Sequence, residues 1–211
     1  SEMALNVLHE VPLDSCDADT QGAIGYQIQQ SLGNEFARRG HAGLAVSVVT
    51  RILVDGNDPA FRHPTKPIGP FFSKDEAEAH ARGRGWQITE DAGRGWRRVV
   101  PSPVPLQILE LAAVKVLVAA GFTVIAGGGG GIPVVKNEAG DFIGIPAVID
   151  KDLTSSLLAC ELGADCLMIT TGVDHVFTGY GTASARPLLS ATPAQLKEMV
   201  AANEFPPGSM R

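Results

Sequence analysis

The chain has 211 residues, a formal net charge of −6 and a pI near 5.3, and 45% of its residues are hydrophobic. This composition supports a globular protein with a buried core, and the acidic balance argues against a protein that binds nucleic acid regardless of sequence. Cys16, Cys160 and Cys166 show no CxxC or Cys/His metal spacing and follow no secretory signal, so we expect a reduced, cytoplasmic protein without a metal site of its own.

The first part of the chain predicts a helix followed by a strand. Asp19 or Thr20 can cap the helix, and Gly40 is expected to end it. Residues 45–54, AVSVVTRILV, are typical of a strand. The face of the helix that we expect to be buried repeats every fourth residue, at Ile24, Ile28, Leu32 and Phe36.

Residues 55–103 depart from this regular alternation. Four prolines interrupt long elements, and Ser73 opens the capping box SKDE of a short helix. The turn at 91–93 lies between two strand-like segments and predicts a hairpin. We therefore expect residues 55–103 to form a small protruding, lid-like subdomain outside the main sheet.

Helix and strand patterns resume after Pro105. A helix is predicted that ends at Gly121, followed by a strand over residues 122–126. Residues 116–135 carry no charge, but five glycines and Pro133 within them argue against a membrane span. The helix face that we expect to be buried consists of Leu106, Leu109, Ala113, Val116 and Leu117.

The remaining third predicts a hairpin, a helix, a strand and a last helix. The hairpin turns at residues 137–140, a helix begins near Asp152, residues 164–171 form the strand, and Thr192 precedes the last helix. The apolar helix positions that should face inward are Leu153, Leu157, Leu158 and Leu162. Helices between strongly apolar strands predict the α/β class, as a three-layer αβα sandwich with a mainly parallel central sheet.

Five consecutive glycines, residues 127–131, follow the strand at 122–126 directly. Each glycine inside an element costs roughly 0.5–1 kcal/mol relative to alanine, so the run needs a reason other than packing. Backbone N–H groups at the carboxyl end of a strand can hold an anion, and open α/β sheets bind ligands at that edge. A crowded turn between packed elements is the other interpretation.

Several motifs occur in the order that is typical of carbamate kinases, in the amino-acid kinase superfamily. They are PLD at 12–14, TQGAIGY at 20–26, PTKPIGPF at 64–71, GRGWRRVVPSP at 93–103, GGGGIPVV at 128–135, VIDKDL at 148–153 and PGSM at 207–210. The resemblance covers essentially the whole chain, 1–211, as one kinase-like domain. Their combination is specific, although a glycine run alone would be weak.

The resemblance implies phosphoryl transfer between carbamoyl phosphate and ADP, with ATP and carbamate on the other side, and it also implies Mg²⁺ and a homodimer. That chemistry needs positioning and positive charge around the migrating group. By similarity, Lys151 neutralises the transferring group, Asp152 orients it and Lys66 reaches it from the lid-like subdomain. Without the family, the Asp-Lys-Asp segment would be read as a helix start and Lys66 as a loop residue.

The resemblance also implies which residues bind phosphate and nucleotide. Gly172 stands where the family commonly has aspartate, so a side-chain contact from that position is lost. His175 is more often a surface histidine than a catalytic one. The residues implied for phosphate or carbamate are Gly128, Gly129, Gly130 and Gly131, and those for nucleotide are Thr171, Val173, Asp174, Tyr180, Ser209 and Met210.

Two glycine-containing loops that begin carbamate kinases, and a lysine beyond the PGSM motif, have no counterpart here. We expect a fragment of a complete kinase, with a natural truncation or a second polypeptide as the alternatives. Two function hypotheses follow: a carbamate kinase, or a non-catalytic amino-acid-kinase-like binding or assembly subunit.

Overall fold

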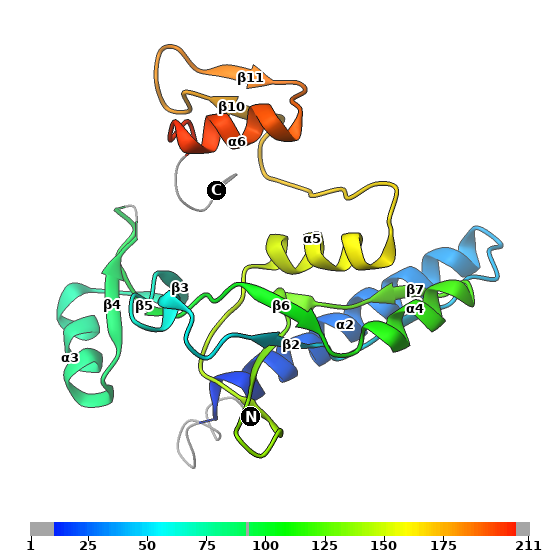
Figure 1. Ribbon diagram of the computed structural model, residues 1–211, viewed down its shortest axis with the longest axis horizontal. Coiled ribbons are helices and arrows are strands. Elements are labelled where there is room, and N and C mark those ends of the chain that lie inside the picture. The colour runs from blue at the N-terminus through cyan, green and yellow to red at the C-terminus, as the bar shows by residue number, and fades with distance from the viewer. Residues whose placement is uncertain (1–10, 92, 206–211) are drawn as a thin grey trace. The chain divides into compact units, whose positions relative to one another are not determined.

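The computed structural model describes residues 11–91 and 93–205, and the chain divides into two compact units, Ser1–Leu167 and Met168–Arg211. In the described part of the chain, no helix is long and apolar enough to cross a membrane. The helices are α2 (Leu13–Arg38), η1 (Pro59–Phe61), α3 (Lys74–Arg84), α4 (Leu111–Ala119), η2 (Gly128–Gly130), α5 (Lys151–Leu162) and α6 (Pro193–Ala201) (Figure 1).

The described strands form four sheets. The largest has the order β6 (Pro105–Ile108), β2 (Arg51–Val54), β8 (Ile132–Lys136) and β9 (Phe142–Gly144). A three-stranded sheet has the order β3 (Lys66–Phe72), β5 (Trp96–Val100) and β4 (Gln87–Glu90). The two-stranded sheets pair β1 (Ala45–Ser47) with β7 (Thr123–Ile125) and β10 (Val176–Thr178) with β11 (Arg186–Leu188).

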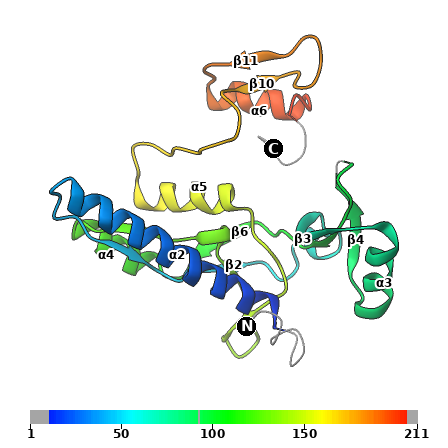
Figure 2. The ribbon, with the colours of Figure 1, turned by 180° about the vertical axis from the view of Figure 1, so that it is seen from behind.

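Residues 45–54 and 123–136 run side by side in parallel, and each segment contributes one strand to the β1–β7 sheet and one strand to the four-stranded sheet. β1 pairs with β7, with Ala45 opposite Thr123, and β2 pairs with β8, with Ile52 opposite Pro133. The strand predicted over residues 45–54 is therefore interrupted between β1 and β2. β6 and β9 add antiparallel edges to the larger sheet. Seen from the front and from behind, α2 and α4 lie on opposite sides of the β1–β7 pair (Figures 1 and 2). The predicted α/β class with helices layered on strands is confirmed.

The core lies where β2 and β6 meet the chain entering α5. Ile52, Val54, Ile108 and Ile149 are buried there, and Leu157 and Leu158 of α5 pack against them. Two of the leucines predicted to face inward from α5 therefore do so. Leu153 does not, because its side chain is 47% exposed.

The helix α2 differs from its prediction at both its start and its buried face. It begins at Leu13 after Pro12, before either predicted cap residue, and Gly40 follows its end with a φ of 67°. Ile24 and Ile28 are 50% and 41% exposed, whereas Gln21 and Gly25 are buried. A Cβ at Gly25 would lie 2.1 Å from Ser47 Oγ, so close approach of the helix to β1 selects the face that carries the glycine.

The prediction that Leu106 and Leu109 belong to a helix is wrong, because the helix begins only at Leu111. Residues 105–108 form β6, which pairs antiparallel with β2 and places Ile108 opposite Ile52 in the core. Pro105 is tolerated because it is the first residue of an edge strand. α4 then begins at Leu111 and buries Val114 instead of Val116, which is 69% exposed.

The strand predicted over residues 164–171 is absent, and this segment is irregular and exposed. Met168 is 82% exposed and Ile169 is 52% exposed. Apolar composition alone does not make a strand, because each strand needs a neighbour for its backbone N–H and C=O groups. In the described residues no strand pairs with this segment.

Apart from the cap of α2, the predictions from local turn and cap chemistry are confirmed. Ser73 and Glu76 form a capping box at α3, and Thr192 forms one with Gln195 at α6. The hairpins predicted around the turns at 91–93 and 137–140 are β4–β5 and β8–β9. The sheet β3–β5–β4 shares no strand with the larger sheet among the described residues.

Near the start of α2, the carboxylate of Asp17 is partly buried, and no polar partner in the described structure offsets the cost of burying its Oδ2 atom. Its Oδ2 atom is buried and has no hydrogen-bond partner in the described structure. Burial, together with the charge of Asp14, raises the pKa of Asp17 to about 6. Since the folded state binds this proton more tightly than the unfolded state, Asp17 lowers stability as pH rises from about 4 through 6, and the loss persists above that.

We therefore expect Asp17→Asn to stabilise the protein at pH 7 but not at pH 4. Solvent screening at this part-exposed site limits the expected gain in the free energy of unfolding to about 1 kcal/mol. Urea unfolding at several pH values measures it. Asp19→Asn, at an exposed neighbour, is the control; an equal gain at both pH values would contradict the assignment.

Candidate phosphate site at the glycine loop

The glycine loop, residues 127–131, joins β7 to β8, between the parallel pair β1–β7 and the parallel pair β2–β8. On the neighbouring segment, which joins β1 to β2, the corresponding break in pairing falls at Thr50, which is 1% exposed. The N–H of Thr50 donates to Gln21 Oε1 at 2.9 Å, and its carbonyl accepts from Gln21 Nε2 at 3.1 Å and from the N–H of Ile132 at 2.9 Å. The Thr50 hydroxyl accepts from the N–H of Gly127 at 2.9 Å. Side chains thus replace the hydrogen bonds that the interrupted ladder lacks.

The conformation and packing of the loop account for most of its glycines. Gly127, Gly129, Gly130 and Gly131 all have φ between 66° and 105°, a region that other residues rarely adopt. A Cβ on Gly130 would lie 2.2 Å from the carbonyl oxygen of Ile149. One on Gly131 would lie 2.3 Å from Cγ1 of Ile52. The crowded-turn interpretation therefore explains these two positions.

Of the four glycines predicted to bind phosphate, only two have a backbone N–H group that is not already bonded within the loop. The N–H groups of Gly130 and Gly131 donate to the carbonyls of Gly127 and Gly128, so they are bonded within the loop. Gly128 and Gly129 are exposed, and in the described structure neither N–H has a protein partner. A ligand that binds the loop backbone therefore meets these two residues first.

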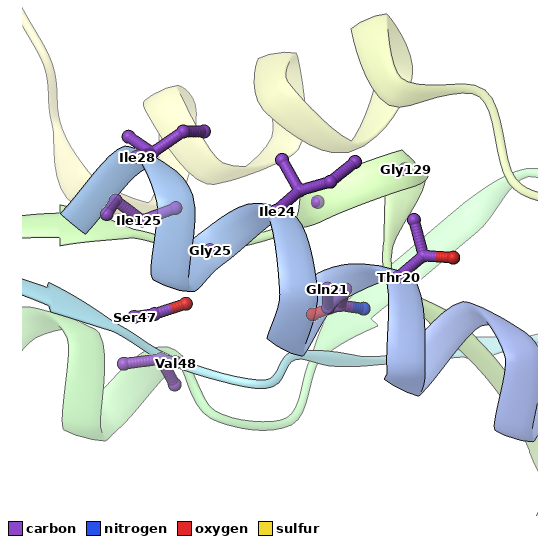
Figure 3. A pocket seen from close by; sticks show the side chains of 10 residues that line it. Thr20, Gln21, Ile24, Gly25, Ile28, Ser47, Val48, Ile125 and Gly129 are labelled. Carbon is purple, nitrogen blue, oxygen red and sulfur yellow. The ribbon is translucent and has the colours of Figure 1, made fainter. Parts of the chain in front are cut away.

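A small pocket of about 60 Å³ opens beside Gly128 and Gly129 (Figure 3). Its side chains come from α2 and from the β1–β7 pair, and Thr20 and Gln21 supply polar groups. The rest of the lining is mainly apolar and consists of Ile24, Gly25, Ile28, Ser47, Val48 and Ile125. Ile24 and Ile28, which are exposed, are among the side chains that line the pocket (Figure 3).

The start of α5 is anchored to the glycine loop. Thr154, 1% exposed, donates from its hydroxyl to the carbonyl of Gly130 at 2.7 Å. Asp150 caps the helix by accepting the N–H of Asp152 at 2.9 Å. The helix N-terminus and its positive dipole end are therefore next to the loop, as an anion site requires.

Lys66 is joined to the same helix end by an ion pair. Its Nζ lies 2.8 Å from Oδ2 of Asp150, and both side chains are about one-third exposed. Burial opposes the ionisation of Asp150, but hydrogen bonds from Lys66 and from the N–H of Asp152 outweigh it, so the pKa of Asp150 lies below its ordinary value. Lys66 begins β3 and pairs with Val100 of β5, so the ion pair links the three-stranded sheet to α5.

Lys151 and Asp152 lie at the surface of the same helix end. The side chain of Lys151 is 69% exposed and its Nζ lies 3.4 Å from Oδ1 of Asp152. Neither side chain is held by a buried contact, so both can meet a ligand. The three residues predicted to be catalytic and the glycine loop are thus gathered around the start of α5.

Sequence reasoning missed the residues that hold this site together. Asp150 had a signal, because an aspartate before a helix is a preferred N-cap. Thr50 and Thr154 had none, and Gln21 stood in the motif TQGAIGY without an assigned role, since the bonds of all three join residues 24 to 77 positions apart in the sequence.

The residues predicted to bind nucleotide fall mainly in the second unit. Thr171, Val173 and Asp174 lie in the irregular, exposed segment that precedes β10, and Tyr180 lies in the turn after it. The Tyr180 ring is 6.1 Å from that of Phe177, measured between centroids. Ser209 and Met210 lie outside the described residues. Their part in binding remains a prediction.

Metal-ligating side chains do not gather in the described structure. Residues 11–91 and 93–205 contain no group of three or more His, Cys, Asp or Glu side chains placed to hold a metal ion.

Comparison with known proteins identifies the family. The profile of the amino acid kinase family matches residues 43–211, so the chain belongs to that family. It is 52% identical over 200 residues to the carbamate kinase-like protein YahI of Escherichia coli, and 48% identical over 198 residues to carbamate kinase 2 of Enterococcus faecalis. In each case the match covers 94% of this chain and 63% of the relative, so the chain spans less than two thirds of their length.

Solved structures agree with this assignment. The carbamate kinase of Giardia lamblia bound to AMP-PNP superposes with a TM-score of 0.86 at 41% identity, over 99% of this chain and 66% of that one. The same enzyme bound to citric acid superposes with a TM-score of 0.88 at 40% identity, with the same coverage. The fold is that of the amino acid kinases, as the motifs predicted.

We expect Thr50→Val to lower the free energy of unfolding by about 1–3 kcal/mol, because valine keeps the shape but leaves the Gly127 N–H without its acceptor. Chemical denaturation measures the change. Thr123→Val, on the exposed side of β7, is the matched control and should change stability little. Equal effects of the two substitutions would show that the Thr50 hydroxyl does not anchor the loop.

Proposed function

We propose that the protein takes part in carbamate kinase chemistry, the reversible transfer of a phosphoryl group between ATP and carbamate, running towards ATP from carbamoyl phosphate and ADP. The observation that carries the proposal is the Lys66–Asp150 pair, which brings a cation from the three-stranded sheet to the start of α5 beside the glycine loop. The similarity to carbamate kinases over 94% of the chain supports it.

Phosphoryl transfer asks a protein mainly for position and positive charge, since charge spreads over the oxygens of the migrating group. The N–H groups of Gly128 and Gly129 and the N-terminus of α5 would bind phosphate oxygens. Lys151, on the exposed side of the helix end, would stay close to the phosphoryl group as it migrates. Asp152, whose Oδ1 lies 3.4 Å from Lys151 Nζ, would orient the phosphoryl group by positioning Lys151. Lys66 would leave Asp150 to bind carbamoyl phosphate.

The nucleotide would be bound by residues of the second unit, Thr171, Val173, Asp174 and Tyr180, together with Ser209 and Met210. Mg²⁺ would come with the nucleotide and be held largely by phosphate oxygens, as is usual for this ion. Its charge would add to that of the lysines during transfer. Gly172 supplies no side chain, so recognition there would rely on the backbone.

Three free cysteines, Cys16, Cys160 and Cys166, support a reduced cytoplasmic location for the protein.

Lys151→Ala should lower kcat for ATP formation by on the order of 10²–10³-fold and raise the KM for ADP much less, because it removes a contact strongest in the transition state. Lys66→Ala should mainly raise the KM for carbamoyl phosphate. Steady-state kinetics with both substrates decide between these effects. Lys115→Ala, an exposed lysine of α4, is the control.

A near-normal kcat in Lys151→Ala would show that the Asp-Lys-Asp segment only begins a helix and takes no part in phosphoryl transfer. Saturable nucleotide binding without any turnover in the unaltered protein would instead favour the alternative, a non-catalytic binding or assembly subunit of the same family.

We also propose a homodimer. Exposed apolar side chains on α2, among them Tyr26 at 64%, give self-association a surface to cover. Sedimentation equilibrium at micromolar concentration should give a mass near twice 22.1 kDa. A stable monomer would contradict the proposal.

A further inference from the structure

A second cleft, of about 430 Å³, lies between the three-stranded sheet and the β8–β9 hairpin. Trp86 and Arg98 line it on the side of the three-stranded sheet, and Val135 and Ile145 line it on the side of the hairpin. Phe61 adds an aromatic wall. None of the residues assigned to phosphoryl transfer contributes to this lining.

The side of the cleft formed by Trp86 is well supported. The Trp86 ring stacks on that of His80, with centroids 4.6 Å apart and planes 25° from parallel. The guanidinium carbon of Arg98 lies 5.1 Å from the centre of the same indole ring, and that of Arg84 lies 5.4 Å from it. Stacking on the ring holds the Arg98 guanidinium in place while leaving its N–H groups able to donate.

Arg98 differs from the other arginines of its hairpin in having no carboxylate partner. Arg94 and Arg97 both donate to Asp91, at 2.9 and 3.1 Å. Among the described residues no carboxylate lies within 4.0 Å of the nitrogens of Arg98, although its side chain is partly buried. A part-buried cation without a counterion favours an anion from solution.

We propose that this cleft binds a small organic carboxylate. The fork of the guanidinium matches two carboxylate oxygens, and the side chains of Val135, Ile145 and Phe61 offer apolar surface to the body of the ligand. A fully hydrated inorganic anion gains nothing from those walls. The site requires an acid head and an apolar body in one molecule.

The indole ring provides a direct readout of binding. The chain has two tryptophans, so Trp96→Phe leaves Trp86 as the sole indole fluorophore. We expect cyclohexanecarboxylate to change the emission of Trp86 in a saturable way. Its neutral counterpart, cyclohexylmethanol, should bind at least ten-fold more weakly, and inorganic phosphate should not compete.

Arg98→Met, in the same background, should weaken cyclohexanecarboxylate binding by about 10- to 100-fold, the value of a hydrogen bond to a charged group. Arg94→Met, whose guanidinium is bonded at the turn outside the cleft, should bind as before. Far-UV circular dichroism establishes that each variant is folded. If Arg98→Met fails to fold, Arg98→Lys should show a smaller weakening, because it keeps the charge and loses the fork.

Unchanged affinity in the Arg98 variant, equal binding of the neutral alcohol, or no saturable response would each overturn the proposal. The readout is binding and not turnover, so the result is independent of whether the protein transfers phosphoryl groups.

Discussion

The rest of the first unit depends on the pairing of one side-chain amide with one backbone position. Gln21 donates to the carbonyl of Thr50 and accepts from its N–H, at a point where the parallel strands stop pairing. A buried break in a ladder would otherwise leave polar groups unsatisfied, at about 1–3 kcal/mol each. Because Gln21 lies on α2, the same bonds fix the helix against the strands. They also leave the Thr50 hydroxyl in position to accept a hydrogen bond from the N–H of Gly127.

The glycine loop is consequently a packed structure and not a flexible one. Its backbone is fixed from one side by Thr50 and from the other by Thr154, and Ile149 and Ile52 leave no room for side chains at Gly130 and Gly131. Donors that are already in place cost little reorganisation when an anion arrives. The positive backbone angles needed for this shape explain why glycine, and no other small residue, stands at four of the five positions of the run, Gly128 being the exception.

Features governed by neighbouring residues could be predicted from the sequence, and features governed by distant contacts could not. The capping boxes and both hairpins follow from turn chemistry within a few residues. The buried face of α2 follows instead from the approach of Gly25 to Ser47, and β6 exists because β2 offers it an edge. Residues 164–171 look like a strand in composition but lack a neighbour. At the site, Lys66 and Lys151 were singled out from the motifs, whereas the pairing of Asp150 with Lys66, 84 residues away in the sequence, is visible only in the structure.

The ion pair between Lys66 and Asp150 makes the binding of any anion at this lysine an exchange of one negative partner for another. Asp150 cannot leave, since it also caps α5, so an incoming phosphate must approach a carboxylate that stays behind. The affinity gained is then only the difference between two ion pairs, reduced further by repulsion between the two anions. An anion bound there would therefore be held less tightly than by a lysine that has no carboxylate partner.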